Sequence, residues 1–302
     1  MMNLSVNIGG LKLRNPIMNA SGTFGLSDYS RYIDFSKIGA LVAKSITLNP
    51  RRGNKPPRIA EVQSGIINSV GIQNDGTMDF VKNKLPEMKK FDVPLIVSVS
   101  NLSVSDYKAS VEILEKEDGI AAYEINVSCP NLKMGGKAFG MSADDTYNVT
   151  GYVKDVTAKP VIVKLSPNVT DIVEIAKAAC EAGADALTVA NTYTAMAVNL
   201  KIKKPMLSNV TGGLSGAAIK PITMRLVYEI KKSLDIPVIA CGGVYNAQDA
   251  LEYLMLGASA VQVGTANFRK PDIMIDIIDG IKDYMIKENI NDINDFIGSI
   301  KF

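Results

Sequence analysis

Short apolar runs recur along the chain and alternate with segments of helical periodicity. Several runs lack apolar and polar alternation, which is typical of strands that are covered on both faces. Repeated strand and helix units of this kind predict a parallel sheet with helices packed around it. The eight runs span residues 16–20, 40–43, 95–99, 123–127, 161–165, 186–190, 238–240 and 260–263.

Helix start and stop signals lie between these runs. Ser103 can cap a helix over 107–116, with Asp106 in its first turn, and residues 168–171 and 246–249 precede apolar segments in the same way. Gly183 and Gly257 follow the last two of these helices and are suited to ending them. We therefore predict one domain over residues 1–302, a (β/α)8 TIM barrel with its active site at the C-terminal ends of the strands.

Polar residues or glycines stand in or directly after the C-terminal ends of the predicted strands. They are Ser21, Gly22, Lys44, Ser45, Asn101, Asn126, Lys164, Asn191, Thr192, Gly242, Gly243, Gly264 and Thr265. Loops begin at strand ends, so any single residue of this set could reflect ordinary loop polarity. The two lysines follow nearly unbroken apolar runs, where an unpaired ammonium is costly, and we expect an anionic ligand as their partner.

The glycine turns after the last two strands predict a phosphate site. Backbone N–H groups at Gly242, Gly243 and Gly264 can approach a ligand closely, and barrels frequently bind phosphate there. Such turns are weak evidence alone, because many glycines serve only a tight turn. If the phosphate belongs to a flavin mononucleotide (FMN), Lys164 is a suitable donor to the reduced ring, and the amides of Asn101 and Asn126 suit ring and substrate edges.

Cys129 lies in the loop that follows the fourth run. A thiol near cationic side chains can have a lowered pKa, and the thiolate can then serve as a base toward a carbon acid. The glycine-rich segment 133–137 after it is expected to be mobile. Cys180, in a predicted helix, is expected to act as a small apolar residue, and Cys241 to pack beside its glycine turn.

Composition narrows the possible chemistry. The 33 basic and 31 acidic residues are interspersed, without a basic run, which argues against a nucleic-acid partner. The chain has no histidine, and its three cysteines form no Cys-x-x-Cys pair, so we expect no disulfide framework, zinc or iron-sulfur site, or other metal. No leader peptide and no apolar run of membrane-spanning length are evident, and we expect a cytoplasmic protein without membrane contact.

Several motifs, in this order, resemble those of a known family. They are NPIMNASG at 15–22, KSIT at 44–47 with NPR at 49–51, NSVGIQN at 68–74, NVSCPN at 126–131, GGLSG at 212–216 running into IKP at 219–221, and the two glycine turns. The set resembles the class 1 dihydroorotate dehydrogenases, specifically the NAD-linked branch called class 1B, over essentially the whole chain. A cysteine in the fourth motif, where the membrane-bound class has serine, favours the soluble class.

The resemblance implies oxidation of (S)-dihydroorotate to orotate in de novo pyrimidine (UMP) biosynthesis. Cys129 would take the C5 proton while the C6 hydride passes to N5 of FMN. The residues that the resemblance places around FMN are Ser21, Lys44, Ser45, Asn101, Asn126, Lys164, Ala190, Gly216, Gly242, Gly243, Gly264 and Thr265. Those that it places around dihydroorotate are Lys44, Asn68, Ser69, Val70, Gly71, Ile72, Asn126, Asn191 and Thr192.

The same resemblance implies a partner. In the NAD-linked branch a second subunit carries FAD and an iron-sulfur cluster and passes electrons from FMN to NAD. The expected assembly is a homodimer of this chain flanked by two electron-transfer subunits, a heterotetramer. The chain departs from the family at Ala190, where a larger aliphatic residue is expected, at Ala217, where proline is frequent, and at residues 193–196.

Other functions stay open at this point. A related FMN barrel could reduce another pyrimidine, although Lys44 suits a substrate that carries a carboxylate. A fumarate- or quinone-linked dihydroorotate dehydrogenase would work without the partner. A non-redox phosphate-binding barrel, or a catalytically silent regulatory subunit, would share the fold alone.

Overall fold

Eight parallel strands form the central sheet of the protein, a computed structural model that describes residues 2–25, 30–128 and 139–301. In spatial order the strands are β3 (Ile17–Asn19), β16 (Ala260–Val263), β15 (Val238–Cys241), β10 (Ala186–Val189), β9 (Val161–Lys164), β8 (Ala122–Asn126), β7 (Leu95–Val99) and β4 (Leu41–Val42). Each coincides with one of the eight apolar runs, with bounds that differ by at most one residue at either end. The predicted fold class is confirmed.

The two outer strands of this order meet and close the sheet into a barrel. A parallel bridge joins Met18 to Ala40. Beside it, the Asn19 side chain donates to the Val42 carbonyl at 2.8 Å and accepts from the Val42 N–H at 2.9 Å. A buried amide thus replaces backbone pairing where the two short strands diverge.

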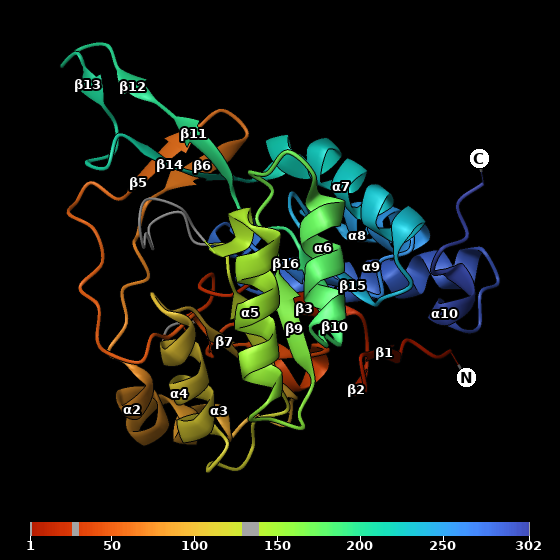
Figure 1. Ribbon diagram of the computed structural model, residues 1–302. Coiled ribbons are helices and arrows are strands. Elements are labelled where there is room, and N and C mark those ends of the chain that lie inside the picture. The colour runs from red at the N-terminus through yellow and green to blue at the C-terminus, as the bar shows by residue number, and fades with distance from the viewer. Residues whose placement is uncertain (1, 26–29, 129–138, 302) are drawn as a thin grey trace.

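Helices cover the outside of the barrel (Figure 1). The longer ones are α4 (Val104–Leu114), α5 (Ala143–Lys154), α6 (Ile172–Glu181), α7 (Lys220–Ser233), α8 (Ala247–Met255) and α9 (Ile273–Lys287). Short helical segments are η1 (Phe35–Lys37), α2 (Thr77–Asp79), η2 (Phe80–Lys84), α3 (Leu85–Met88), η3 (Phe139–Met141), η4 (Ala217–Ile219), η5 (Thr265–Phe268) and α10 (Ile293–Phe296).

The predicted helix signals are confirmed. Ser103 caps α4 by accepting the Asp106 N–H at 3.1 Å, and Asp171 and Asn246 cap α6 and α8 in the same way. Gly183 and Gly257 follow the last two helices with φ of +93° and +108°, a conformation that glycine adopts without steric cost. Helix α4 begins three residues earlier than expected, directly after its cap.

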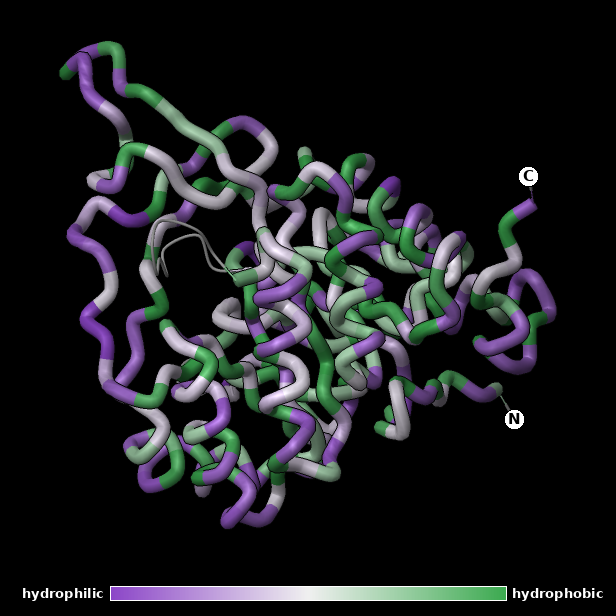
Figure 2. The backbone as a smooth tube through the Cα atoms, viewed as in Figure 1, coloured by the Kyte–Doolittle hydropathy of each residue, from purple (hydrophilic) through white to green (hydrophobic). Residues whose placement is uncertain are grey.

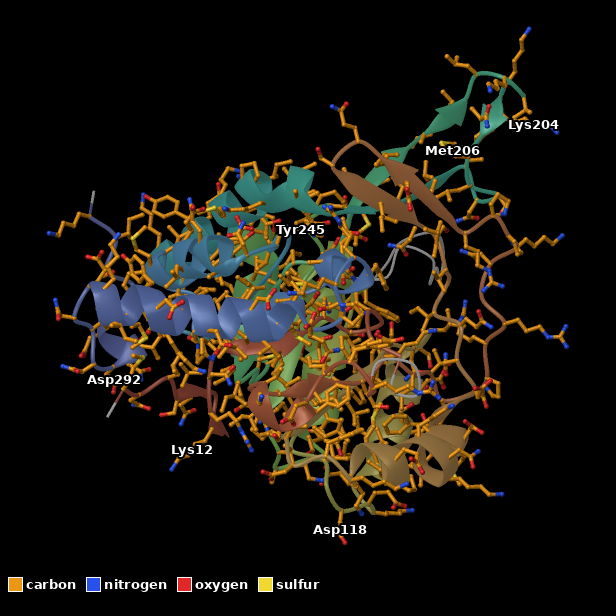
Figure 3. The ribbon with its side chains drawn as sticks, turned by 180° about the vertical axis from the view of Figure 1, so that it is seen from behind. Lys12, Asp118, Lys204, Met206, Tyr245 and Asp292 are labelled. Carbon is orange, nitrogen blue, oxygen red and sulfur yellow. The ribbon has the colours of Figure 1, made fainter. Side chains whose placement is uncertain are left out.

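A second sheet, which the sequence pattern did not predict, lies over the C-terminal end of the barrel. It is antiparallel, with the order β11 (Tyr193–Met196), β14 (Thr211–Ser215), β6 (Gly65–Asn68) and β5 (Ile59–Val62). A hairpin of β12 (Val198–Asn199) and β13 (Lys204–Pro205) extends beyond it, and Figure 3 shows Lys204 and Met206 out on this projection. The departure at residues 193–196 is therefore a strand of this sheet.

The N-terminal hairpin lies at the other end of the barrel. Its strands are β1 (Val6–Ile8) and β2 (Leu11–Leu13). A Cβ on Gly9 would stand 2.4 Å from the carbonyl oxygen of Asp185, the residue before β10, so only glycine permits this contact. The hairpin thus packs where β10 begins, opposite the second sheet.

Apolar side chains from the strands and the inner helix faces form one large core. Figure 2 shows the central strands mostly in the hydrophobic colour, whereas the helices alternate between hydrophobic and hydrophilic residues. A smaller cluster of Ala60, Ile67 and Leu207 packs under the second sheet. Among the described residues, no helix is both long and apolar enough to cross a membrane.

Candidate active site

A cavity of about 500 Å³ opens between the C-terminal ends of the barrel strands and the second sheet. Its size lies within the roughly 300–1,000 Å³ that small-molecule sites occupy. Most of the predicted site residues line it: Ser21, Lys44, Ser45, Asn68, Val70, Gly71, Ile72, Asn126, Lys164, Ala190, Asn191, Thr192, Gly216, Gly242, Gly243, Gly264 and Thr265. Residues far apart in the sequence are thus brought to one place.

Two predicted residues do not line this cavity. The Asn101 side chain is buried and accepts the Leu48 N–H at 2.7 Å while donating to Ser110 Oγ at 3.0 Å. Ser69 is also buried, and its hydroxyl accepts from Asn54 Nδ2 at 2.9 Å. Both side chains hold neighbouring loops in place. The predicted base Cys129 and the segment 133–137 lie outside the described residues.

Lys164 stands at the floor of the cavity with its side chain 5% exposed. Its Nζ donates to Gln262 Oε1 at 3.0 Å and lies 3.6 Å from Glu124 Oε1. Burial lowers the pKa of Lys164, but attraction to its acidic neighbours, Glu124 among them, outweighs burial, and the pKa of Lys164 is raised. Because burial raises the pKa of the Cys241 thiol, Cys241 is neutral near pH 7, and Glu124 is the anion that compensates Lys164.

Glu124 was missed by the sequence analysis, which expected a ligand to compensate this lysine. The only signal was one acidic residue within the run 123–127, two positions before Asn126 and therefore on the same strand face. The carboxylate of Glu124 is fully buried and accepts from Gln262 Nε2 at 2.7 Å, Thr188 Oγ1 at 3.1 Å and Ser98 Oγ at 3.2 Å. Each neighbour comes from a different barrel strand, so together they form a polar layer inside the barrel.

A chain of hydroxyl groups leads from this layer to the amides at the cavity wall. Ser98 Oγ lies 2.8 Å from Ser45 Oγ, which lies 3.0 Å from Ser21 Oγ. Asn126 Nδ2 donates to Ser45 Oγ at 3.2 Å. Interior hydroxyls therefore connect the residue pair at the floor with the amide at the wall.

The second amide of the wall, Asn191, is held by the same group of residues. Its Nδ2 donates to Asn126 Oδ1 at 3.2 Å and to Ser128 Oγ at 2.6 Å. Ser128 Oγ in turn donates to Asn126 Oδ1 at 2.9 Å. These bonds position the residue immediately before Cys129 against the cavity wall.

Lys44 stands at the mouth of the cavity and remains exposed to solvent. Partial burial lowers the pKa of Lys44; Asp75 raises it and Arg58 lowers it again, with a net result below the ordinary value for lysine. No ion pair of Lys44 occurs within the described part of the chain. Its ammonium is therefore available to an anionic ligand.

The glycine turns form the opposite wall. Gly243 has φ of +72°, and a Cβ there would stand 2.6 Å from Lys220 Cβ. The next turn carries Thr265, whose hydroxyl donates to Ser215 Oγ at 2.8 Å. Glycine backbone thus lines this wall of the cavity, and at Gly243 the packing against Lys220 leaves no space for a side chain.

Some lining residues were not predicted. Ile59 and Ile66 come from the unpredicted second sheet, so no local signal could have identified them. Tyr245 lies two residues after Gly243 and Phe268 ends η5, and both add aromatic surface to the cavity. Cys241 lines the cavity beside its turn, while Cys180 packs partly buried on α6, as expected for a small apolar residue.

A barrel whose strand ends enclose a largely apolar cavity, with a buried lysine at the floor and glycine turns at one wall, is typical of an enzyme site for an anionic small molecule. Comparison with known proteins gives the family. The dihydroorotate dehydrogenase family profile matches residues 3–285, and the chain belongs to this family of oxidoreductases.

Full-length relatives agree with this assignment. The chain is 50% identical over 301 residues to the "Dihydroorotate dehydrogenase B (NAD(+)), catalytic subunit" of Thermoanaerobacter pseudethanolicus, covering 99% of both chains. It is 47% identical to the protein of that name from Bacteroides thetaiotaomicron over 302 residues and 100% of both chains. The protein of that name from Geotalea daltonii is 46% identical over 299 residues, which cover 99% of this chain and 98% of the relative.

Proposed function

We propose that this chain is the catalytic subunit of an NAD-linked dihydroorotate dehydrogenase, which oxidises (S)-dihydroorotate to orotate in pyrimidine biosynthesis. The observation that carries the proposal is the pairing of two lysines with two amides around one cavity. Lys164 lies at the floor, Lys44 at the mouth, and Asn126 and Asn191 between them. Membership in the family and the names of the full-length relatives support the same reaction.

The cavity residues fit FMN. Gly242, Gly243 and Gly264 all line the cavity, and the backbone N–H groups of such glycine turns suit the oxygens of a phosphate. Lys164 suits the edge of the ring where negative charge gathers on reduction. The remaining proposed contacts are Ser21, Lys44, Ser45, Asn126, Ala190, Gly216, Gly242 and Thr265. When bound, FMN supplies the acceptor for the hydride that leaves C6 of the substrate.

The substrate is a cyclic amide with a carboxylate, and the cavity offers complementary groups. Lys44 can meet the carboxylate, and the amides of Asn126 and Asn191 can pair with ring N–H and carbonyl groups. We assign further contacts to Asn68, Val70, Gly71, Ile72 and Thr192. Gly71 has φ of +78°, and a Cβ there would stand 2.8 Å from Asn54, so this loop is held against a neighbouring one.

We assign the base to Cys129. Oxidation removes a proton from C5 and a hydride from C6, leaving a C5–C6 double bond. Cys129 follows Ser128, whose hydroxyl is bonded to both wall amides, so the substrate would lie beside the start of the cysteine loop. The thiolate takes the C5 proton, and the amides hold the ring in place for that transfer.

Electrons leave through a partner. The relatives are named as catalytic subunits, which implies a further subunit in their enzymes. Among the described residues, no group of three His, Cys, Asp or Glu side chains is placed to hold a metal ion. We therefore assign FAD and the iron-sulfur cluster to an electron-transfer subunit, and this chain to a single-domain homodimer at the centre of a heterotetramer that reduces NAD.

Purified protein, isolated without its partner, tests the reaction. We expect a yellow protein whose flavin absorption bleaches when dihydroorotate is added without oxygen. A yellow protein that does not bleach would point to another substrate, and affinity for uracil above that for orotate would indicate a different pyrimidine. A colourless protein that takes up no FMN would contradict the proposal and favour a non-redox barrel.

A further inference from the structure

The carboxylate of Glu124 contacts two separate parts of the site from inside the barrel. Lys164 lies beside Oε1 at 3.6 Å, and Ser98 donates to the same oxygen at 3.2 Å. Thr188 and Gln262 donate to Oε2. Each of these hydrogen bonds is one that Glu124 accepts, so the carboxylate has donors on both oxygens.

An acceptor of this kind sets the direction of the hydroxyl chain. Ser98 gives its one hydrogen to Glu124 and must therefore accept from Ser45, 2.8 Å away. Ser45 has then used its own hydrogen and can only accept from its other neighbours. Asn126 Nδ2, at 3.2 Å, fits that requirement because an amide nitrogen only donates.

The other end of the chain is consistent with this direction. Asn126 Oδ1 accepts from the Ser128 N–H at 3.3 Å, and a backbone N–H cannot reverse its role. Asn191 Nδ2 donates to the same oxygen. Among the described residues one N–H of Asn126 is used by Ser45, which leaves the second for a molecule in the cavity.

We propose that Glu124 is a positioning residue that fixes the buried Lys164 ammonium and, through Ser98 and Ser45, orients the Asn126 amide toward the substrate. This inference rests on the proposed function, since it assigns a flavin to the lysine side and orotate to the amide side. Neither side chain of the relay between Glu124 and Asn126 needs to move a proton. The carboxylate acts through the charge and the hydrogen-bond direction that it imposes.

Replacing Glu124 by glutamine tests both effects while keeping the shape. Donors face both oxygens of Glu124. In either orientation, the NH2 group of the new glutamine therefore replaces an oxygen that accepted hydrogen bonds and points at groups that also donate. The titratable groups that face Lys164 from the packed strands are Glu124 and Cys241. Without the carboxylate, burial dominates and the pKa of Lys164 falls.

The first readout is the flavin spectrum as a function of pH. We expect the Glu124→Gln protein to show a new transition of the flavin absorption and midpoint potential between neutral and alkaline pH, which the wild type lacks. The transition should persist when Cys241 is also replaced by alanine, because it belongs to Lys164. The second readout is orotate binding, which should weaken about tenfold through the misoriented amide.

Two further variants separate these effects from simple loss of stability. Ser98→Ala cuts the relay but leaves Lys164 beside Glu124, so it should weaken orotate binding without the spectral transition. Glu115→Gln is the matched control, because Glu115 also accepts from a hydroxyl at 2.6 Å and from Lys159 at 2.9 Å, but does not line the cavity. It should change neither readout.

The outcomes distinguish this inference from the proposed function. A colourless wild-type protein would overturn both. A yellow wild type that bleaches, together with a Glu124→Gln protein of unchanged spectrum and orotate affinity, would overturn the inference alone. If Glu124→Gln does not fold, Ser98→Ala decides: weaker orotate binding supports the relay, and unchanged binding refutes it.

Discussion

The turn at Gly243 provides a quantitative test of the proposed phosphate site. Its φ of +72° is left-handed, and a Cβ there would stand 2.6 Å from Lys220 Cβ and 2.8 Å from Lys220 N. Alanine in this conformation costs about 1–2 kcal/mol. The shift of the backbone that makes room for the methyl group beside α7 costs a further ~1–3 kcal/mol, which is what overpacking costs in a core. We expect Gly243→Ala to lower the free energy of unfolding by about 2–5 kcal/mol.

Gly10 offers a matched control at the far end of the barrel. Its φ is +93°, and a Cβ there meets nothing within 4 Å. Gly10→Ala should therefore show only the conformational cost of about 1–2 kcal/mol. The difference between the two variants isolates the clash against Lys220. Urea unfolding of the FMN-free protein measures both.

FMN titration then connects the turn to function. The backbone of the Gly243 turn must shift to admit a methyl group, so its N–H groups move away from the proposed phosphate position. We expect FMN affinity to fall at least about tenfold in Gly243→Ala and to stay unchanged in Gly10→Ala. Equal destabilisation of the two variants would refute the close packing against Lys220. Equal FMN affinity of the two variants would refute the phosphate role of the turn.

The other predictions concern the two lysines and the base. Lys44→Ala should weaken orotate binding roughly tenfold or more through loss of a charge-assisted contact, and unchanged affinity in a binding titration would exclude that role. Because the pKa of Lys44 is lowered, its charge is present at low pH and is lost as the pH rises. The loss of orotate affinity with rising pH should therefore begin at a lower pH than for a lysine of ordinary pKa, and Lys44→Arg should abolish that dependence. Lys164→Met should destabilise the fold by about 3–5 kcal/mol in urea unfolding by leaving Glu124 unpaired, and adding Glu124→Gln should restore most of that loss; no restoration would argue against the pair. Cys129→Ala should keep FMN but slow its anaerobic reduction by dihydroorotate about 10²–10⁴-fold in stopped flow, and unchanged reduction would exclude the base.

Much of the barrel could be predicted because its signals are local. All eight strand runs, and the caps at Ser103, Asp171 and Asn246, depend on residues that are close together in the sequence. Polar residues at strand ends converge in any barrel, and for that reason most of the predicted site residues line one cavity.

Asn101 shows where that reasoning ends. Its position after a strand predicted that Asn101 would lie near the mouth of the cavity. The direction of its amide depends instead on the loop around Leu48, whose N–H donates to Asn101 Oδ1. The second sheet was also missed, because its strands are short and β14 contains Gly212 and Gly213, which weaken any strand signal.

The sequence by itself determined the barrel, its helices and the set of polar residues at one end. Only the tertiary structure decided that the anion beside Lys164 is Glu124, a residue of the neighbouring strand. The physical reason is that strand register and the direction of interior side chains determine which buried charges meet. The sequence around a single buried acidic residue does not indicate which residue it will pair with, because that partner comes from another strand of the closed barrel.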